Sequence, residues 1–165
     1  MLALVAAALA PSDLSPDPSW PSVSIIVPTN SRPEFVGRML EMVAAQDYDL
    51  ERLQVVVVDD SPPELRAPAL AAGEQRLGAM HVIYVLLPAV VSIGEKRNVA
   101  IEHSVGFDVI AHWDDDDIYA PQRLAAQLEP LRDGSADITL LEHQAIYYTA
   151  EDELHVADMP WKLVP

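Results

Sequence analysis

The sequence predicts an α/β protein with a mostly parallel sheet that is flanked by helices. Two observations carry this prediction. Short apolar segments of strand type alternate with segments in which apolar residues recur at helical spacing. The strand segments, such as 54–58, are apolar almost throughout, which is typical of strands covered on both faces.

Five strands are expected from apolar runs rich in β-branched residues. They lie at 23–27, 54–58, 80–87, 107–113 and 138–141. A hairpin is expected after them, with 144–149 paired to 154–156 around residues 150–153. The turns that follow the first, second and fourth of these strands are polar.

Helices are expected between the strands. Ser31 with Glu34, and Ser92 with Glu95, have the spacing of a capping box, in which each side chain bonds the other residue's backbone. The first box precedes a helical stripe formed by Phe35, Met39, Met42 and Val43. Residues 64–77 and 121–131 are also predicted to be helical, although Pro68 must interrupt or begin the former.

Composition limits the function classes. The chain has 165 residues, half of them hydrophobic, which favours one domain with a proper core. Its formal net charge of −16 argues against nucleic-acid binding through phosphates and against docking on anionic lipid. Because the chain has no cysteine, disulfides and thiolate metal sites are excluded. An anionic ligand would need the few cations at its site, or a bound metal.

The N-terminal segment 1–21 is interpreted as separate from the folded domain, which is expected over 22–165. Residues 1–10 are apolar but too short to span a bilayer, so no transmembrane segment is expected. Residues 11–21 carry four prolines and resemble a linker, with a weak secretory signal over the segment as the alternative. Localisation is not fixed by the sequence, and a cytoplasmic protein is favoured.

Four consecutive aspartates, Asp114 to Asp117, directly follow the fourth predicted strand and lie between Trp113 and Tyr119. Adjacent carboxylates repel one another, so a fold that gathers them needs a cation or full solvation. Ligands of open α/β sheets bind beyond the carboxyl ends of the strands, where this run is expected. The run is interpreted as a divalent-metal site, with a solvated acidic turn as the alternative.

Two further polar clusters are expected at the same edge of the sheet. They are Pro28 to Arg32 and Asp59–Asp60, and each taken alone also fits a turn that caps the next helix. Arg97 shares a helical stripe with Ile93 and Ile101 and is therefore expected to point inward. A partly buried guanidinium requires an anionic partner, which is either the aspartate run, a phosphate or a structural Arg–Asp bridge.

Taken together, four segments resemble the successive motifs of family 2 glycosyltransferases over about residues 22–135. The segments are VSIIVPT (23–29), VVDDS (57–61), GEKRN (94–98) and WDDDDIYAP (113–121). The resemblance implies a GT-A fold, a Rossmann-like nucleotide-diphospho-sugar transferase fold. In that fold a DxD motif holds Mn²⁺ or Mg²⁺ against the diphosphate of the sugar donor.

The resemblance also implies site residues. Pro28 and its neighbours should line the base and ribose, Asp60 should reach the base, and Asp116 is the foremost metal ligand. The implied nucleotide-binding residues are Pro28, Thr29, Asn30, Arg32, Asp60, Arg97, Asp114 and Asp115, and the implied metal ligands are Asp114 and Asp116. One departure is that Asn30 and Ser31 stand where the family usually has an aromatic residue followed by Asn.

The predicted function is that of a glycosyltransferase-like enzyme, which transfers sugar from a nucleotide-diphosphate donor to an unknown acceptor, a glycan, lipid or protein. The alternative is a non-catalytic sugar-nucleotide binding module. The alternative arises because the family's acceptor region and catalytic base normally lie further along the chain. Glu142 and His143 follow the fifth predicted strand, but no motif supports either as the base. The catalytic residue therefore stays unassigned, and the acceptor part is expected to be incomplete.

Two other enzyme classes fit the sequence less well. A phosphohydrolase with an aspartate nucleophile would carry its DxD after the first strand, whereas here the run follows the fourth. A nucleotidyltransferase would need a Gly-rich, basic first loop, and Pro28 to Pro33 contains no glycine.

Overall fold

The computed structural model describes residues 19–67, 70, 73–141, 143–148 and 150–158. The chain forms two compact units, Met1–Leu124 and Ala125–Pro165. Within the described ranges, no helix combines the length and the apolar character that crossing a bilayer requires. The predicted boundary between 1–21 and 22–165 stays a prediction, because most of the N-terminal segment lies outside the described residues.

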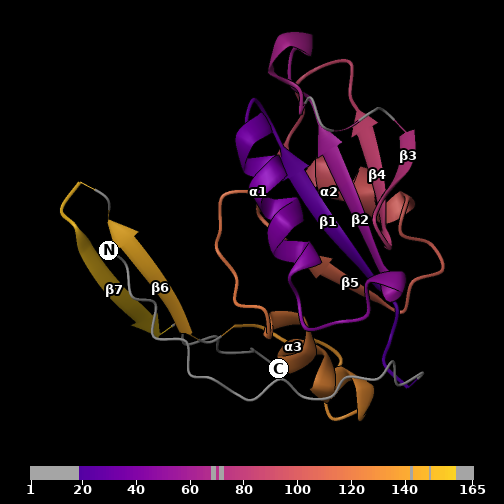
Figure 1. The fold of residues 1–165 in the computed structure, drawn as a ribbon, viewed down its shortest axis with the longest axis vertical. Helices are drawn as coiled ribbons and strands as arrows, with labels where there is room; N and C mark the ends of the chain where they lie inside the picture. Colours follow the sequence, from indigo (N-terminus) through magenta and orange to yellow (C-terminus); the bar gives the residue numbers. More distant parts are fainter. Residues whose placement is uncertain (1–18, 68–69, 71–72, 142, 149, 159–165) are drawn as a thin grey trace. The chain divides into compact units, whose positions relative to one another are not determined.

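The first unit is built on a five-stranded sheet in the order β3-β4-β2-β1-β5 (Figure 1). Its strands are β1 (Val23–Thr29), β2 (Leu53–Asp59), β3 (Gly73–Leu77), β4 (Met80–Leu86) and β5 (Val109–His112). β1 pairs in parallel with both β2 and β5, and β2 pairs in parallel with β4, whereas β3 is antiparallel to β4. The mostly parallel sheet predicted from the apolar runs is confirmed.

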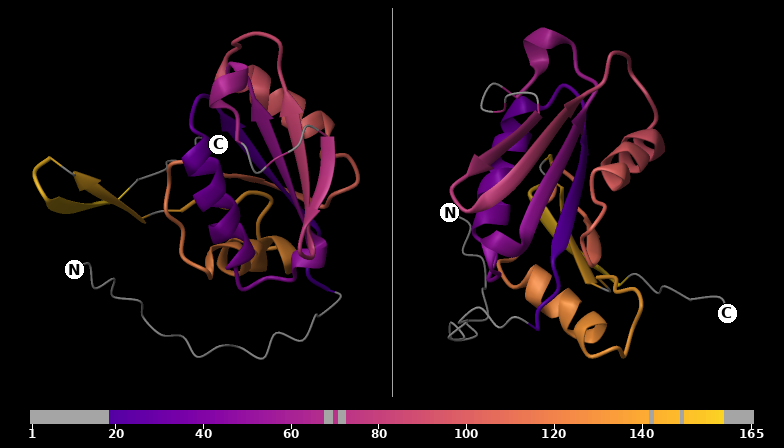
Figure 2. Two further views of the ribbon diagram at one scale, coloured as in Figure 1. Left: turned by 45° about the horizontal axis from the view of Figure 1, so that its top comes forward. Right: turned by 90° about the vertical axis from the view of Figure 1, so that its right-hand side faces the viewer.

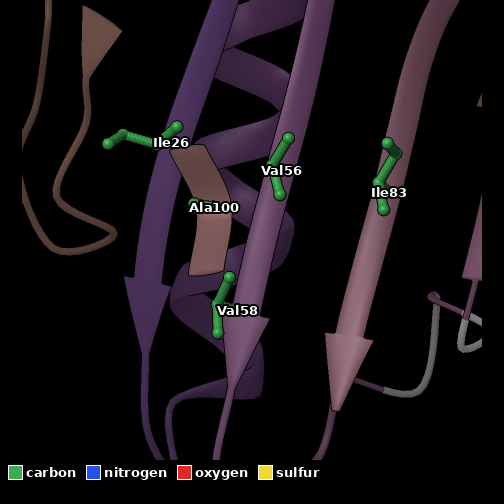
Figure 3. Packing of buried hydrophobic residues seen from close by; sticks show 5 residues of the cluster. All are labelled: Ile26, Val56, Val58, Ile83 and Ala100. Atoms are coloured by element: carbon green, nitrogen blue, oxygen red, sulfur yellow. The ribbon is translucent and has the colours of Figure 1, made fainter. Parts of the chain in front are cut away.

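Helices cover both faces of this sheet (Figure 2). α1 (Pro33–Ala44) lies on one face and α2 (Ile93–Glu102) on the other. Against α2, a cluster of Ile26, Val56, Val58, Ile83 and Ala100 is buried (Figure 3). Because neighbouring strand residues point to opposite faces, the intervening valines and isoleucines turn toward α1. β1 and β2 are buried along their whole length, which explains their uninterrupted apolar sequence.

The two predicted capping boxes have different outcomes. Ser92 and Glu95 form the predicted box at the start of α2, with both reciprocal bonds present. At α1 the box is wrong: Arg32 is the N-cap, without a side-chain bond, and Pro33 opens the helix. Ser31 has a φ of 55°, and this left-handed turn places it outside the capping position. The fixed φ of Pro33 starts the helix instead.

The helix predicted over 64–77 is wrong. A single 3₁₀ turn, Pro63–Leu65, is followed by strand β3, which pairs with β4. Gly73 (φ 102°) and Gly78 (φ 63°) adopt left-handed conformations at either end of β3, and Gly78 lies in the tight turn to β4. Pairing with β4 therefore makes residues 73–77 a strand, although their sequence pattern predicted a helix. The strand predicted over 138–141 is also wrong, since these residues are irregular.

The last helix, α3 (Arg123–Arg132), begins two residues later than predicted. The second unit ends in the predicted hairpin, formed by β6 (His143–Tyr148) and β7 (Glu153–Asp158). The pairing register joins Tyr148 to Glu153 across the tip. Asp152, with a φ of 56°, makes the turn.

Candidate functional site

Polar loops from four strands of the first unit meet at one edge of the sheet, where the parallel strands end. Thr29 ends β1 and the loop after it carries Asn30 to Arg32, while the loop after β2 carries Asp60. The loop after β5 carries the four aspartates, while the loop after β4 leads into α2. The first three of these loops were predicted from the sequence, and their side chains are in direct contact.

Asp60 is the centre of a buried hydrogen-bond hub. Its Oδ1 accepts from Lys96 Nζ and from Asn30 Nδ2, each at 2.6 Å, and its Oδ2 accepts from the backbone N–H of Val91 at 2.9 Å. The Asp60 side chain is 0% exposed and that of Lys96 is 8% exposed. Burial raises the pKa of Asp60, but the bonds from Lys96, Asn30 and Val91 outweigh it and hold the pKa below its usual value.

A second chain of contacts joins the first loop to the aspartates. Thr29 Oγ1 donates to Asp115 Oδ2 at 2.6 Å. Arg32 Nη1 bridges Asp115 Oδ1 at 3.1 Å and Asp116 Oδ2 at 2.6 Å. Hydrogen bonding to Asp115, with the charges of Asp116 and Asp115, raises the pKa of Arg32. Because Lys96 Nζ also donates to the Thr29 carbonyl at 2.8 Å, the hub and the aspartate run form one network.

Asp59 supports the site from below. Its carboxylate accepts from Tyr84 Oη and from the hydroxyl and N–H of Ser61, and all three residues are buried. Ser61 Oγ in turn accepts from the N–H of Ser31 at 2.6 Å. This series of hydrogen bonds fixes the left-handed turn at Ser31. It thereby sets the direction in which the Arg32 side chain points.

An aromatic and cationic cluster fixes the aspartate loop. Trp113 is fully buried and packs edge-on against Tyr119, with ring centroids 4.5 Å apart. The Arg123 guanidinium lies 4.4 Å from the Trp113 ring and 3.7 Å from the Tyr119 ring, and it donates to the carbonyl of His112. Tyr119 Oη donates to Asp117 at 2.8 Å. The loop is therefore anchored at both ends.

Arg97 is partly buried and contacts the aspartate run, but it does not share a buried stripe with Ile93 and Ile101 as predicted. Ile93 and Ile101, whose stripe it shares, are both exposed, and the buried residues of α2 are Lys96 and Ala100. Arg97 is one-third exposed and lies 3.4 Å from Asp114 Oδ1, a contact at the long limit of a hydrogen bond. Lys96 was missed. The small residues Ala100 and Ser104, four and eight positions later, would have identified its face, because small side chains let a helix approach a sheet.

The aspartates of the run differ in exposure. Asp115 is buried, whereas the Asp114 and Asp116 side chains are 47% and 45% exposed. Among the residues that the structure describes, no three acidic or histidine side chains are gathered as a metal cage. Mg²⁺ is commonly bound by only one or two carboxylates together with substrate phosphates. The exposed oxygens of Asp114 and Asp116 fit that donor set, and the buried Asp115 does not.

The predicted site residues are thus brought together. The expected contact between Asp60 and a base stays a prediction; the Asp60 side chain is buried, and half-buried Asn30 lies beside it. Pro28 lies within β1, directly before Thr29. Of the candidates for the base, Glu142 lies outside the described residues, and His143 is described only as the first residue of β6.

Fold and site define a class: an α/β domain of the doubly wound type, with a polar ligand edge at the carboxyl ends of its parallel strands. The family model described as glycosyl transferase family 2 matches residues 24–160. The chain belongs to this family, and the resemblance seen in its motifs is confirmed.

Solved structures agree on the fold. TarS of S. aureus is 21% identical, with a TM-score of 0.58 over 74% of this chain and 22% of that one. The mannosyltransferase PcManGT of Pyrobaculum calidifontis, in complex with GDP-Man and Mn²⁺, is 26% identical, with a TM-score of 0.52 over 68% of this chain and 33% of that one. S. aureus TarS 1–349 in complex with UDP is 24% identical, with a TM-score of 0.51 over 64% of this chain and 30% of that one.

The fold is therefore GT-A, as expected. This chain spans between about a fifth and a third of the length of these three structures. A comparison with curated proteins gives no match.

Proposed function

We propose that the first unit binds a nucleotide-diphosphate sugar at the carboxyl edge of its sheet, as the donor half of a glycosyltransferase. The observation that carries this proposal is the single network from Lys96 and Asp60 through Thr29 to Asp115 and Arg32. It joins all four segments that resemble the family's motifs: 23–29, 57–61, 94–98 and 113–121. The complexes of PcManGT with GDP-Man and of TarS with UDP support the donor class.

Each side chain has a role that follows from its position. Asn30 lines the nucleotide; buried Thr29 positions Asp115, and Asp60 holds the Asn30 amide in place. Exposed Arg32 and partly exposed Arg97 are the cations for the diphosphate, since a guanidinium can donate two parallel bonds to phosphate oxygens. Asp114 and Asp116 would hold Mn²⁺ or Mg²⁺. When bound, the metal supplies positive charge that stabilises the diphosphate leaving group.

Transfer also requires a base that takes the proton of the acceptor hydroxyl. The base is not among the residues of the network at the donor edge. General-base assistance is typically worth about 10²–10⁴-fold, so a chain without it binds donor and transfers sugar slowly. The second candidate function, a sugar-nucleotide binding module, rests on this point. The identities of the acceptor and of the base therefore decide between the two candidate functions.

The test is calorimetric titration of UDP-sugars and GDP-sugars with and without Mn²⁺. The proposal predicts binding that Mn²⁺ strengthens at least about tenfold, because metal and phosphates complete one another's coordination. The Asp116→Asn variant should lose most of that gain. Asp108→Asn is the matched control, since it makes the same change at an exposed position just before β5, at its opposite end. No binding by any donor, or equal losses in both variants, would contradict the proposal.

A further inference from the structure

The last aspartate of the run is bonded to the aromatic cluster beside it. Asp117 Oδ2 accepts a hydrogen bond from Tyr119 Oη at 2.8 Å. The Tyr119 ring packs edge-on against fully buried Trp113, with ring centroids 4.5 Å apart. The Arg123 guanidinium lies 3.7 Å from the centroid of the Tyr119 ring and donates to the carbonyl of His112 at 2.7 Å. The tyrosine hydroxyl therefore reaches Asp117 from a fixed position.

The segment that follows Tyr119 is held by the loop at the end of α1. Gln46 is buried and lies two residues after the helix. Its Nε2 donates to the carbonyl of Ala120 at 3.0 Å, and its Oε1 accepts from the N–H of Leu124 at 3.2 Å. Both ends of one buried amide are thus used to fix residues 120–124. Because this support comes from a different element, it does not depend on the aspartate loop itself.

Asp114 and Asp116 have partners of another kind. Arg97 Nη2 lies 3.4 Å from Asp114 Oδ1, and Arg32 Nη1 lies 2.6 Å from Asp116 Oδ2. Both are partly exposed ion pairs, which are weak and can exchange with another cation. Within the described ranges, Asp117 is not gathered with two further acidic or histidine side chains into a cage. The run is therefore divided, with two carboxylates paired to exposed cations and Asp117 bonded to a fixed hydroxyl.

This division matters for a divalent ion. Mg²⁺ is commonly held by one or two carboxylates together with substrate phosphates, and the affinity of a protein site for a divalent ion depends on how many charged ligands hold it. Two carboxylates leave coordination positions for the diphosphate, so the ion and the donor strengthen each other's binding. A third carboxylate would hold the ion firmly without the donor, and this dependence would be reduced.

Resting on the proposed function, we infer that Tyr119 withholds Asp117 from the metal. The ion is then left with the exposed oxygens of Asp114 and Asp116 and with the phosphates of the donor. Tyr119 is a positioning residue in this scheme, because it acts on the metal only through Asp117. Its hydroxyl sets the degree to which metal binding depends on the donor.

The inference is tested by titrating Mn²⁺ into the wild-type chain and into Tyr119→Phe, with the free ion followed by electron paramagnetic resonance. Phenylalanine keeps the ring that Trp113 and Arg123 contact and removes only the hydroxyl. Without nucleotide, Tyr119→Phe should bind Mn²⁺ about tenfold more tightly, because a third carboxylate is released. The gain in Mn²⁺ affinity given by UDP or GDP should fall in this variant to about threefold or less.

Two controls separate the hydroxyl from its carboxylate. Asp117→Asn alone should leave the Mn²⁺ affinity within about twofold of the wild-type value, and the double variant Tyr119→Phe with Asp117→Asn should return to that value. Tyr147→Phe is the matched control. It removes a hydroxyl that donates to Asp152 in the hairpin, where Tyr147 is exposed, and it should leave Mn²⁺ binding unchanged.

The outcomes are distinct. An unchanged Mn²⁺ affinity in Tyr119→Phe would overturn the inference. A loss of affinity in Asp117→Asn as large as that in Asp116→Asn would make Asp117 a metal ligand that Tyr119 orients, and would overturn it as well. If UDP and GDP do not strengthen Mn²⁺ binding by the wild-type chain, the proposed function fails, and the titrations without nucleotide still decide whether Tyr119 restrains Asp117.

Discussion

Two ion pairs at the donor edge, Lys96–Asp60 and Arg32–Asp116, have similar distances and opposite burial. Lys96 and Asp60 are 8% and 0% exposed, whereas Arg32 and Asp116 are 47% and 45% exposed. A buried pair is costly to break, because either partner left alone is an uncompensated charge out of water. An exposed pair is worth about 0–1 kcal/mol and exchanges readily with other ions. The Lys96–Asp60 pair is therefore suited to fixing the positions of the loops, and the Arg32–Asp116 pair can be displaced by a ligand.

Replacing Lys96 should therefore destabilise the fold. Lys96→Met keeps most of the stem but leaves the Asp60 carboxylate buried without its cation, at an expected cost of about 3–5 kcal/mol in the free energy of unfolding. The double variant Lys96→Met with Asp60→Asn removes both charges and should regain much of this loss. Urea denaturation measures both. A cost below about 1 kcal/mol in the single variant would show that the pair is not an essential part of the buried hub.

Acid should act through the same pair. The folded pKa of Asp60 lies below its unfolded value, so its stabilisation is fully present above the unfolded pKa and is lost as the pH falls through the folded pKa. Below about pH 4, the wild-type chain should lose stability more steeply than the Lys96→Met, Asp60→Asn double variant. Unfolding free energies measured between pH 5 and pH 3 compare the two slopes. Parallel slopes would assign acid sensitivity to other carboxylates.

Arg32 should compete with a metal for Asp116. The Arg32 guanidinium contacts the Asp116 carboxylate, so Arg32→Gln should strengthen the binding of Mn²⁺ alone several-fold. The same variant should weaken the binding of a nucleoside diphosphate, because a cation for the phosphates is lost. Arg38→Gln, an equal charge change at an exposed position of α1, is the control. Equal Mn²⁺ affinities in the two variants would exclude a local competition.

At the scale of elements, α2 positions Lys96, the cation of the buried hydrogen-bond network around Asp60. The capping box at Ser92 fixes its first turn, Ala100 lets it lie close to the sheet, and Lys96 reaches the strand ends between them. The start of α2 could be predicted, because a capping box is local chemistry. The inward residue was predicted wrongly, since neighbouring helix positions differ by about 100° and the prediction followed the apolar stripe of Ile93 and Ile101 instead of the small residues Ala100 and Ser104.

The same contrast explains the other errors. β3 forms because it pairs with β4 between left-handed glycines, and its own sequence carried a helical pattern that this pairing overrode. Ser31 lost its capping role to Pro33, whose φ fits the first helical turn without a side-chain bond. The three polar clusters were predictable as a convergent edge, because parallel strands end at the same side. Which side chains of these clusters bond one another could be learned only from the tertiary structure.

Removing the cap of α2 tests its contribution. Ser92→Ala eliminates the hydroxyl that accepts from the N–H of Glu95, and it should lower the free energy of unfolding by about 1 kcal/mol. Ser92→Asp retains a capping side chain and should stay within a few tenths of a kcal/mol of the wild-type value. Chemical denaturation distinguishes them. Equal losses in both variants would show that the hydroxyl does not contribute through capping.

At the scale of the whole molecule, the protein is strongly acidic and yet is proposed to bind an anion. Its net charge of −16 repels phosphate at long range. Of its ten lysine and arginine residues, four lie in the network around the donor edge: Arg32, Lys96, Arg97 and Arg123. These four cations, together with a divalent ion bound by the exposed aspartates, would offset the net negative charge of the protein at the donor edge.

The most direct measurement of the central claim is the broadening of backbone amide NMR signals by Mn²⁺ in the presence of UDP or GDP. The paramagnetic ion broadens the signals of nearby amides, so it reports where the metal and the diphosphate lie. A donor site at the carboxyl edge should give selective broadening over residues 29–32, 60–61 and 113–117, which is lost in Asp116→Asn but not in Asp108→Asn. Broadening centred on other acidic segments, or an identical pattern in both variants, would contradict a donor site at the carboxyl edge of the sheet.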